Sequence, residues 1–455
     1  MTMIRPPAVA GTFYPADPAA LLREVEELLD GADSLVVRFG HPKVLVVPHA
    51  GYIYSGATAA QAYAELANAR GLIRRVVLLG PVHRVAVRGL ALPGADAFAT
   101  PFGSVPVDAD AVRLLDGLPQ VVTSAPAHAL EHSLEVQLPF LQRILGSFSV
   151  LPLAVGEATR EEVAEVLERL WGGPETLIVI STDLSHYHAY EDARRIDGDT
   201  AGRIDRLDAG LNHAQACGAT PLNGLLELAR RKGLTIRRLA LCNSGDTAGG
   251  RERVVGYAAF ALDAGPAIGT VDAGRTLMTL ARSAIAHRLG LGEAPGELSA
   301  PWLAQPGATF VTLTREGRLR GCIGSLSPQR PLGADVVANA QAAAFRDPRF
   351  APLTAAEWPG TQTEVALLSA AKSIRFADEQ ELLERITPGE DGLILEADGR
   401  RGTFLPQVWE QLPDKREFLA HLKQKAGLPA GTRITRCRVL RYRVIKWKQS
   451  DFRFQ

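Results

Sequence analysis

The sequence lacks an excess of charge of either sign. Lysine plus arginine number 50, and so do aspartate plus glutamate, which gives a formal net charge of zero. A basic surface attracts nucleic acid and anionic membranes, and this balance offers no electrostatic reason to expect either partner. We therefore predict a protein that binds neither nucleic acid nor a membrane.

Long hydrophobic runs and paired cysteines are absent as well. No apolar stretch approaches the length of a membrane-spanning helix, and the first residues show no signal-peptide core. The four cysteines are scattered and form no Cys-x-x-Cys pair, which argues against a disulfide framework or a zinc knuckle. These absences predict a cytoplasmic protein. Its 455 residues are too many for one ordinary core, so we expect two or three domains.

One short stretch organises the first half of the chain. Residues 44–47 are all apolar, which is typical of a strand buried on both faces, and Pro48 ends it because proline cannot donate to a ladder. His49 follows directly, and a glycine loop with Tyr52 and Tyr54 leads into a predicted helix. This order places the loop at the carboxyl edge of a parallel sheet, where ligands bind. Taken alone, His49 fits a structural loop histidine equally well.

The same layout recurs twice. Residues 75–80 form a second apolar run that leads to His83, and residues 177–181 form a third that leads to Asp183 and His186. Parallel strands end at one edge of a sheet, so these loops can converge. Three such placements in a chain with ten histidines favour a functional site. Asp183 is near enough to orient His186 or to act as a base, although it could instead cap a helix.

Two more segments add candidates. On a helix, His132 and Glu135 would share a face, and such a pair can hold a metal. A structural pair, or a His132 that contacts the substrate, fits this spacing as well. Cys217 precedes a predicted helix start at Pro221, and the positive end of a helix favours a thiolate. A small buried thiol is the alternative for Cys217.

A short Gly/Pro/Ala-rich segment, residues 263–273, divides the chain. Strands and helices alternate before it, which predicts an α/β domain over residues 1–262. The part after it has β-rich runs interspersed with helices and shows no histidine cluster. Residues 274–455 should therefore form a separate α+β domain.

The motifs of both parts resemble known families. The first part resembles the Memo family through Phe13-Tyr14-Pro15, Pro48-His49-Ala50-Gly51-Tyr52, Leu79-Gly80-Pro81 with His83, Glu131-His132-Ser133-Leu134-Glu135, Ser181 with Asp183 and His186, and Cys217-Gly218. The second part looks like an AMMECR-type domain through Leu319-Arg320-Gly321-Cys322-Ile323-Gly324 and Phe345-Arg346-Asp347-Pro348-Arg349-Phe350. The combination resembles the AmmeMemoRadiSam set, in which these two modules accompany a radical-SAM protein.

The resemblance implies a metal site. The Memo family is similar in fold to LigB-type extradiol dioxygenases, which hold non-haem iron, so the sheet should be LigB-like and flanked by helices. Carried over by motif, His49, His83 and Cys217 would be the metal ligands, and Asp183 and His186 would line the site. The dioxygenases use two histidines and a carboxylate, whereas the third position here would be a thiolate. Such a donor set favours iron(II), copper or zinc without deciding among them.

We therefore expect a dioxygenase-like oxidoreductase with Fe(II) as the preferred metal and a small substrate of aromatic type. His186, steered by Asp183, would act as acid or base, and His132 would hydrogen-bond the substrate. Tyr52 and Tyr54 would supply an aromatic wall. The AMMECR-type half would shape access to the site or bind a radical-SAM protein.

Two alternative functions stay open. One is a non-catalytic scaffold that uses the same pocket to bind a metal or another ligand. The other is a metal-free hydrolase in which Cys217 is the nucleophile and a histidine is the base.

Overall fold

The computed structural model describes residues 2–32, 41–67, 69–263, 271–296, 300–369, 371–429 and 431–452. The chain forms two compact units that divide after residue 264. Most of the predicted linker, residues 264–270, lies outside the described residues. Within the described ranges, no helix has both the length and the apolar character that crossing a membrane requires.

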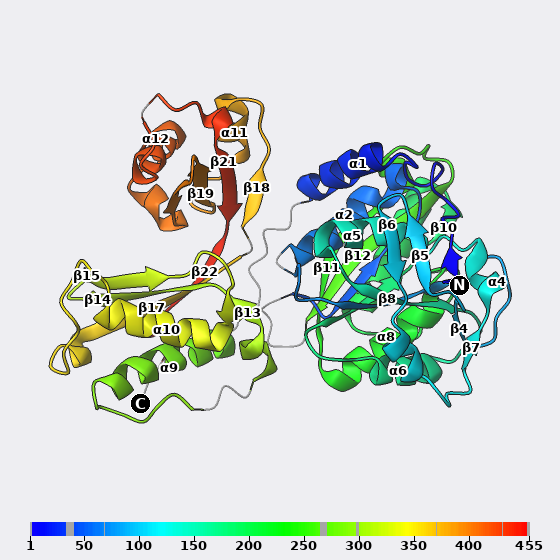
Figure 1. The fold of residues 1–455 in the computed structure, drawn as a ribbon, viewed down its shortest axis with the longest axis horizontal. Helices are drawn as coiled ribbons and strands as arrows, with labels where there is room; N and C mark the ends of the chain where they lie inside the picture. Colours follow the sequence, from blue (N-terminus) through cyan, green and yellow to red (C-terminus); the bar gives the residue numbers. More distant parts are fainter. Residues whose placement is uncertain are drawn as a thin grey trace. The chain divides into compact units, whose positions relative to one another are not determined.

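The first unit is built on a nine-stranded sheet, whose strands β12, β8, β4 and β7 are labelled in Figure 1. In this sheet β2, β9, β3 and β8 run parallel. Their carboxyl ends therefore lie at one edge, which confirms the predicted α/β class. The sheet order is β10 (His186–His188), β12 (Val254–Asp263), β2 (Val44–Val47), β9 (Thr176–Ser181), β3 (Arg75–Pro81), β8 (Ser149–Val155), β4 (Leu90–Leu92) and β7 (Val121–Thr123), with β11 (Thr235–Asn243) paired to β12.

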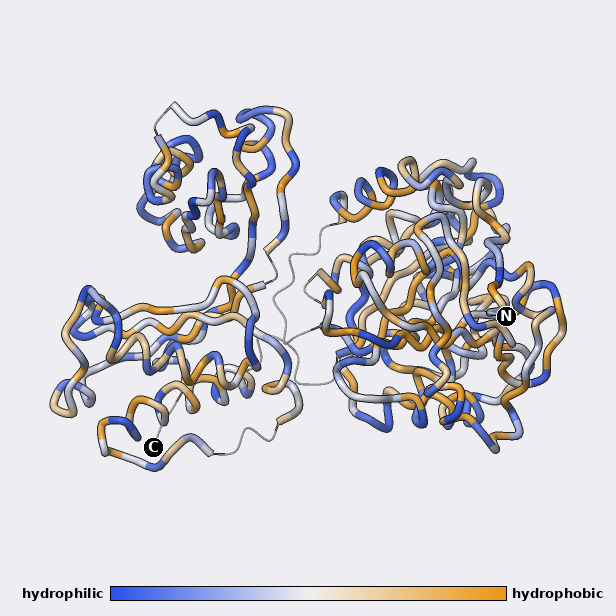
Figure 2. Tube along the Cα trace, viewed as in Figure 1, coloured by the Kyte–Doolittle hydropathy of each residue, from blue (hydrophilic) through white to orange (hydrophobic). Residues whose placement is uncertain are grey.

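Both faces of this sheet are buried. In β2, Val44 and Val46 belong to one cluster of buried residues, whereas Leu45 and Val47 belong to another, because successive strand side chains point to opposite faces. The strands of the central sheet are accordingly drawn largely in orange, the colour of apolar residues, in Figure 2. One cluster includes α3 (Ala109–Arg113), α6 (Arg160–Arg169), α7 (Tyr190–Asp205) and α8 (Ala219–Lys232); the other includes α1 (Pro18–Gly31), α2 (Ala57–Tyr63), α4 (Ala125–Ala129) and α5 (Leu138–Leu145).

A small second sheet joins the N-terminus to this unit. Its three strands are β1 (Ile4–Arg5), β5 (Ala97–Thr100) and β6 (Gly103–Pro106), with β1 parallel to β5. This pairing brings Arg5 to the segment around residue 131, where its Nη2 donates to the Glu131 carbonyl at 2.6 Å.

The second unit is α+β, as predicted, with two four-stranded antiparallel sheets. The first sheet has the order β15 (Arg318–Gly324), β14 (Thr309–Arg315), β17 (Thr361–Leu368) and β22 (Val444–Lys448), and packs against α9 (Val271–Arg288) and α10 (Leu332–Phe345). The second has the order β18 (Lys372–Ile374), β21 (Arg438–Tyr442), β19 (Gly392–Ala397) and β20 (Arg400–Phe404), and packs against α11 (Glu379–Arg385) and α12 (Lys415–Lys425). The short strands β13 (Pro306–Gly307) and β16 (Arg330–Pro331) form a separate pair.

Candidate functional site

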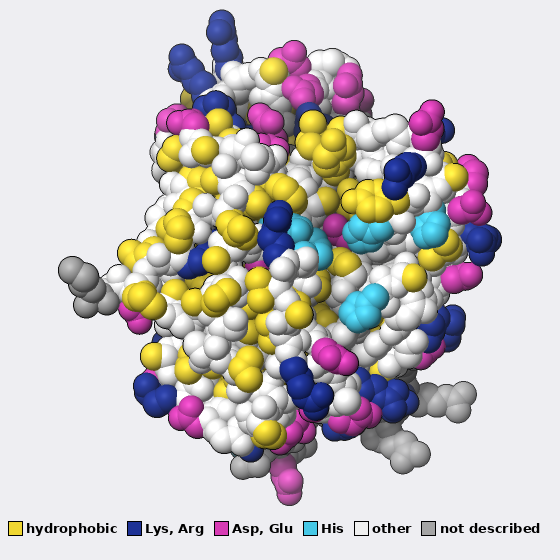
Figure 3. All heavy atoms as spheres, turned by 90° about the vertical axis from the view of Figure 1, so that its right-hand side faces the viewer, with side chains coloured by type: hydrophobic (Ala, Val, Ile, Leu, Met, Phe, Trp, Pro, Cys, Tyr) yellow, Lys and Arg dark blue, Asp and Glu magenta, His cyan; other side chains and the backbone are white. Residues whose placement is uncertain are grey.

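Three histidines meet at the carboxyl edge of the large sheet. His49 follows β2, His83 follows β3, and His132 lies between α4 and α5, and one ligand atom from each lies within 4.8 Å of the other two. Their ring centroids are 4.7 to 5.4 Å apart. The His49 side chain is 2% exposed, whereas that of His83 is 29% exposed, so the group is open to solvent on one side. Figure 3 shows histidine side chains, in cyan, around a hollow on one face.

The hydrogen bonds of His49 fix which ring nitrogen faces the site. Ser181 Oγ donates its proton to the Ser133 carbonyl at 2.6 Å and accepts from Gln137 Nε2 at 2.9 Å. His49 Nδ1, 2.9 Å from the same oxygen, must therefore donate to it, which leaves the lone pair on Nε2. Burial, aided by the nearby His83, lowers the pKa of His49 to about 3, so this imidazole is neutral at pH 7.

His83 is held in the same way by Glu131. One oxygen of this buried carboxylate accepts from His83 Nδ1 at 2.9 Å, and the other accepts from the His83 backbone N–H at 2.7 Å. The backbone N–H groups of His132 and Ser133 also donate to Glu131. Burial alone would raise the pKa of Glu131, but these hydrogen bonds and the His83 ring lower it to about 2. The carboxylate is therefore ionised, and His83 presents Nε2 to the site.

His132 does not lie on a helix, which corrects the predicted helical face shared with Glu135. It precedes the short 3-10 turn Glu135–Gln137, and α5 begins only at Leu138. Burial, followed by repulsion from His49 in its protonated form, lowers the pKa of His132 to about 4. Glu135 lies apart from the histidines and binds Arg5, the Tyr14 hydroxyl and two backbone N–H groups of the N-terminal segment. It is a structural carboxylate.

Cys217 lies beside His49 but outside the three-histidine group. Its Sγ is 3.3 Å from His49 Nε2, and the Asp183 backbone N–H donates to it at 3.3 Å. The next residue is a glycine because a Cβ there would lie 2.7 Å from Thr182 Cβ. Burial, followed by the Asp183 carboxylate, raises the pKa of Cys217 to about 12. Burial therefore outweighs the predicted effect of the helix start, which would favour a thiolate. The neutral thiol donates to His49 Nε2.

Asp183 contacts His49 rather than His186, which corrects the predicted steering. Its Oδ1 accepts from the His49 backbone N–H at 2.7 Å, and its Oδ2 is 3.9 Å from His49 Nε2. Burial raises the pKa of this carboxyl. His186, at the start of β10, instead places Nδ1 2.8 Å from the Leu184 carbonyl. Since a carbonyl only accepts, Nδ1 donates and Nε2 carries the lone pair.

The two tyrosines of the glycine loop have different positions. Tyr52 is 4% exposed, its hydroxyl donates to the Val136 carbonyl at 2.7 Å, and its ring packs against Phe140. It belongs to the core and is not available as a wall of the site. Tyr54 is 39% exposed, so its assignment to substrate binding stays a prediction.

Of the three predicted ligands, His49 and His83 lie in one group with His132. The third, Cys217, contacts His49 at 3.3 Å but lies outside that group, so its role as a ligand stays a prediction. Sequence reasoning missed Glu131 and Ser181 as the groups that orient the two rings. An acidic residue directly before His132 was the only local signal for Glu131. Imidazoles that are fixed through Nδ1 and present Nε2 to the site, as in His49 and His83, suit zinc, copper or iron. The chemistry that these residues support is therefore metal binding.

Comparisons with known proteins identify the families of both parts of the chain. The Memo family model, described as Memo-like protein, matches residues 5–261, and the AMMECR1 model matches residues 278–447. A MEMO1 family protein of Aquifex aeolicus is 37% identical over 267 residues, which cover 56% of this chain and 97% of that protein. One of Aeropyrum pernix is 37% identical over 280 residues, which cover 56% of this chain and 98% of that protein.

Among solved structures, that of an uncharacterized protein from Pyrococcus horikoshii is 33% identical, covers 39% of this chain and 91% of its own, and has a TM-score of 0.37. The family model spans more than half of this chain, and the relatives are covered almost completely. The chain therefore belongs to the Memo family, and its Memo-like domain is followed by an AMMECR1 domain.

Proposed function

We propose that the Memo-like domain binds a divalent metal ion, with His49 and His83 as two of its ligands. The observation that carries this proposal is that both rings are fixed through Nδ1, to Ser181 and Glu131 respectively. His83 Nε2 therefore faces the site, and His49 Nε2, which accepts from the Cys217 thiol, becomes available once that contact gives way to a metal. Both rings belong to a group that spans no more than 4.8 Å. Fe(II) is the preferred ion, and copper or zinc suits the same donors.

The third ligand is either Cys217 or His132. Cys217 follows from the resemblance to the family, and its Sγ lies 3.3 Å from His49 Nε2. His132 follows from the geometry, because it completes the group of three ring nitrogens. The two choices differ in proton release: a thiol with its pKa raised to about 12 must lose a proton to bind, whereas neutral His132 loses none.

We propose further that the domain is a dioxygenase-like oxidoreductase that acts on a small substrate of aromatic type. The bound metal would supply a Lewis acid for a substrate oxygen or activate dioxygen. His186 is the base in this scheme, because its Nδ1 donates to Leu184 and its Nε2 is free to take a proton. Tyr54, whose side chain is exposed, is available to contact the substrate ring.

Metal analysis of anaerobically purified protein tests the site. We expect His49→Ala and His83→Ala each to lose the metal, while His421→Ala, an exposed histidine of the second unit, keeps it. A loss in Cys217→Ser with retention in His132→Ala would identify the thiolate as the third ligand, and the reverse pattern would identify the imidazole. Unchanged metal content in both His49→Ala and His83→Ala would refute the site.

Oxygen consumption with a panel of catechols tests the reaction. Uptake that is lost in His186→Gln, with metal content unchanged, would support the proposed base. Full metal occupancy without oxygen uptake for any catechol would favour a non-catalytic metal-binding scaffold.

The hydrolase alternative has one supporting observation, the 3.3 Å contact between Cys217 Sγ and His49 Nε2. The opposed pKa shifts count against it, because they keep this pair neutral rather than as thiolate and imidazolium. Rapid alkylation of Cys217 by iodoacetamide that added metal does not slow would favour the hydrolase over the metal site.

A further inference from the structure

A groove of about 800 Å³ lies at the end of the large sheet opposite to the histidines. Two of its residues, Arg70 and Phe148, come just before β3 and β8, whereas His83 comes just after β3. β3 has seven residues, and at about 3.3 Å per residue it separates the two places by roughly 20 Å. The groove is therefore distinct from the proposed metal site.

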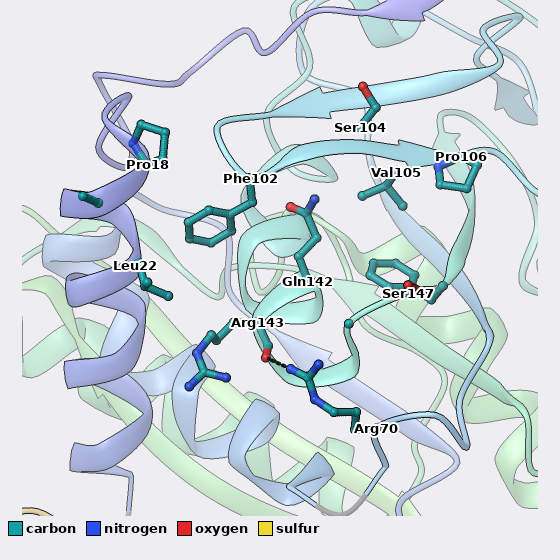
Figure 4. A pocket seen from close by; sticks show the side chains of 13 residues that line it. Pro18, Leu22, Arg70, Phe102, Ser104, Val105, Pro106, Gln142, Arg143 and Ser147 are labelled. Carbon is teal, nitrogen blue, oxygen red and sulfur yellow. Dashed lines mark hydrogen bonds between the residues drawn. The ribbon is translucent and has the colours of Figure 1, made fainter.

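Much of the wall of the groove is apolar. Leu22 of α1 lies on one side with Phe102 from the turn before β6, and Val105 lies on the other (Figure 4). Phe148 also lines the groove. Leu22 is 40% exposed, whereas Val105 and Phe148 are almost fully buried. An apolar surface of this shape favours an apolar ligand.

The charge of the groove comes from arginine. No acidic residue is among those that line it. Arg143 is paired with Glu26 at 2.7 Å, so its charge is already balanced. Arg70 donates to the Arg143 carbonyl at 2.6 Å, and among the described residues no carboxylate pairs with it. The groove therefore carries one positive charge that no acidic side chain within the described ranges balances.

The guanidinium of Arg70 is held at a defined place. It lies over Gly146, the residue that ends α5 with a φ of +78°, and a Cβ at that position would be 2.7 Å from Arg70 Nη1. The positive φ favours glycine there, and the absence of a Cβ leaves room for the guanidinium. The hydrogen bond to Arg143 uses only Nη2, so donors of the fork are left for a ligand (Figure 4).

We propose that this groove binds a small amphipathic carboxylate, with its apolar body between Leu22 and Phe102 and its carboxylate on Arg70. The volume lies within the range of about 300–1,000 Å³ that is typical of small-molecule pockets. A guanidinium fork matches a carboxylate in geometry as well as in charge. This site goes beyond the proposed metal function and does not depend on it.

Isothermal titration with decanoate and with decanol, which have equal chain lengths, tests the carboxylate. We expect the 455-residue protein to bind decanoate at least about tenfold more tightly than decanol, since a guanidinium binds a carboxylate more strongly than a neutral hydroxyl. Arg70→Gln should lower the affinity for decanoate alone, so that the two ligands bind with similar affinity. Arg74→Gln, an exposed arginine that does not line the groove, should keep the preference.

A second variant tests the apolar wall. Leu22→Gln keeps a good helix former on α1 but should weaken decanoate and decanol by the same factor. Three outcomes would overturn the proposal. The unmodified protein could bind both ligands with equal affinity, the preference for decanoate could survive Arg70→Gln, or decanoate could show no saturable binding at millimolar concentration. Binding to phosphatidylglycerol vesicles without saturable binding of decanoate would also overturn it, in favour of a membrane surface.

Discussion

Glu131 and Glu135 lie four residues apart in one segment, and both carboxylates are buried, at 2% and 0% exposure. Glu131 accepts from His83 Nδ1 and thereby aims an imidazole into the candidate metal site. Glu135 accepts from Arg5, Tyr14 and two backbone N–H groups, and holds the N-terminal segment on the domain. The same residue type therefore serves a site at one position and the fold at the other.

The difference lies in the partners rather than in burial. A guanidinium is always charged, so the pair of Glu135 with Arg5 has one protonation state and a structural role. An imidazole has two ring nitrogens, and fixing one of them, as Glu131 does for His83, leaves the other as a ligand. Substitutions at the two positions should consequently separate stability from metal affinity.

The largest expected effect is on stability in Glu135→Ala. The Arg5 side chain is 4% exposed, and removal of the carboxylate leaves its charge buried without a counter-charge. We expect the free energy of unfolding to fall by about 3–5 kcal/mol, measured by urea denaturation. The metal content of the folded fraction should not change. A loss of metal without a loss of stability would mean that Glu135 belongs to the site after all.

His128 extends the comparison to histidines, because it is buried, as His49 is, but has a structural partner. Its ring donates through Nε2 to the Ala91 carbonyl at 2.7 Å, and burial lowers its pKa to about 4. Between the unfolded pKa of about 6.5 and this value, only the unfolded chain binds the proton. His128 therefore lowers the free energy of unfolding as the pH falls from about 6.5 to 4. The decrease reaches about 3 kcal/mol at the lower end of this range.

His128→Gln tests this linkage. The amide can still donate to the Ala91 carbonyl but does not titrate, so the stability of the variant should depend less on pH between about 6.5 and 4. Urea denaturation at several pH values compares the variant with the unmodified protein. The other histidines are present in both proteins, so their contribution to the pH dependence cancels in the comparison. Parallel stability curves for the two proteins would contradict the prediction.

The part of this architecture that the sequence predicts depends on neighbours along the chain. Apolar runs that end in Pro48 or Pro81 and continue into a histidine mark the carboxyl ends of buried strands. Parallel pairing then brings His49 and His83 together without further information. The fold class and the location of the site follow from these local patterns alone.

The rest depends on partners that are remote in sequence. Glu131 acts on a ring 48 positions away, and Arg5 reaches Glu135 across 130 positions. Local spacing suggested a helical face over His132 and Glu135 instead, because it carries no information on tertiary contacts. Cys217 shows the same limit for chemistry: the helix start is local, but the burial that raises its pKa is not.

Glu131→Gln should lower metal affinity. The amide oxygen can still accept from His83 Nδ1, but the amide nitrogen cannot replace the oxygen that accepts from the His83 backbone N–H. Without the negative charge the ring is also a poorer ligand and is less firmly oriented. We expect a 10–100-fold lower metal affinity, on the order of outer-shell substitutions in other metalloproteins, measured by competition with a chelator. Glu135→Gln is the matched control, and equal losses of affinity in both variants would abolish the distinction between the two carboxylates.

The smallest effect is expected in the glycine loop, where Tyr52 and Tyr54 repeat the comparison between fold and site. Tyr52→Phe removes the hydrogen bond to the Val136 carbonyl at 2.7 Å, which should lower the free energy of unfolding by about 1 kcal/mol. Tyr54→Phe, at an exposed position, should leave stability within about 0.5 kcal/mol of the unmodified protein. Both variants should retain the metal, so a loss of metal in Tyr52→Phe would show that the core beneath His49 also positions the ligands.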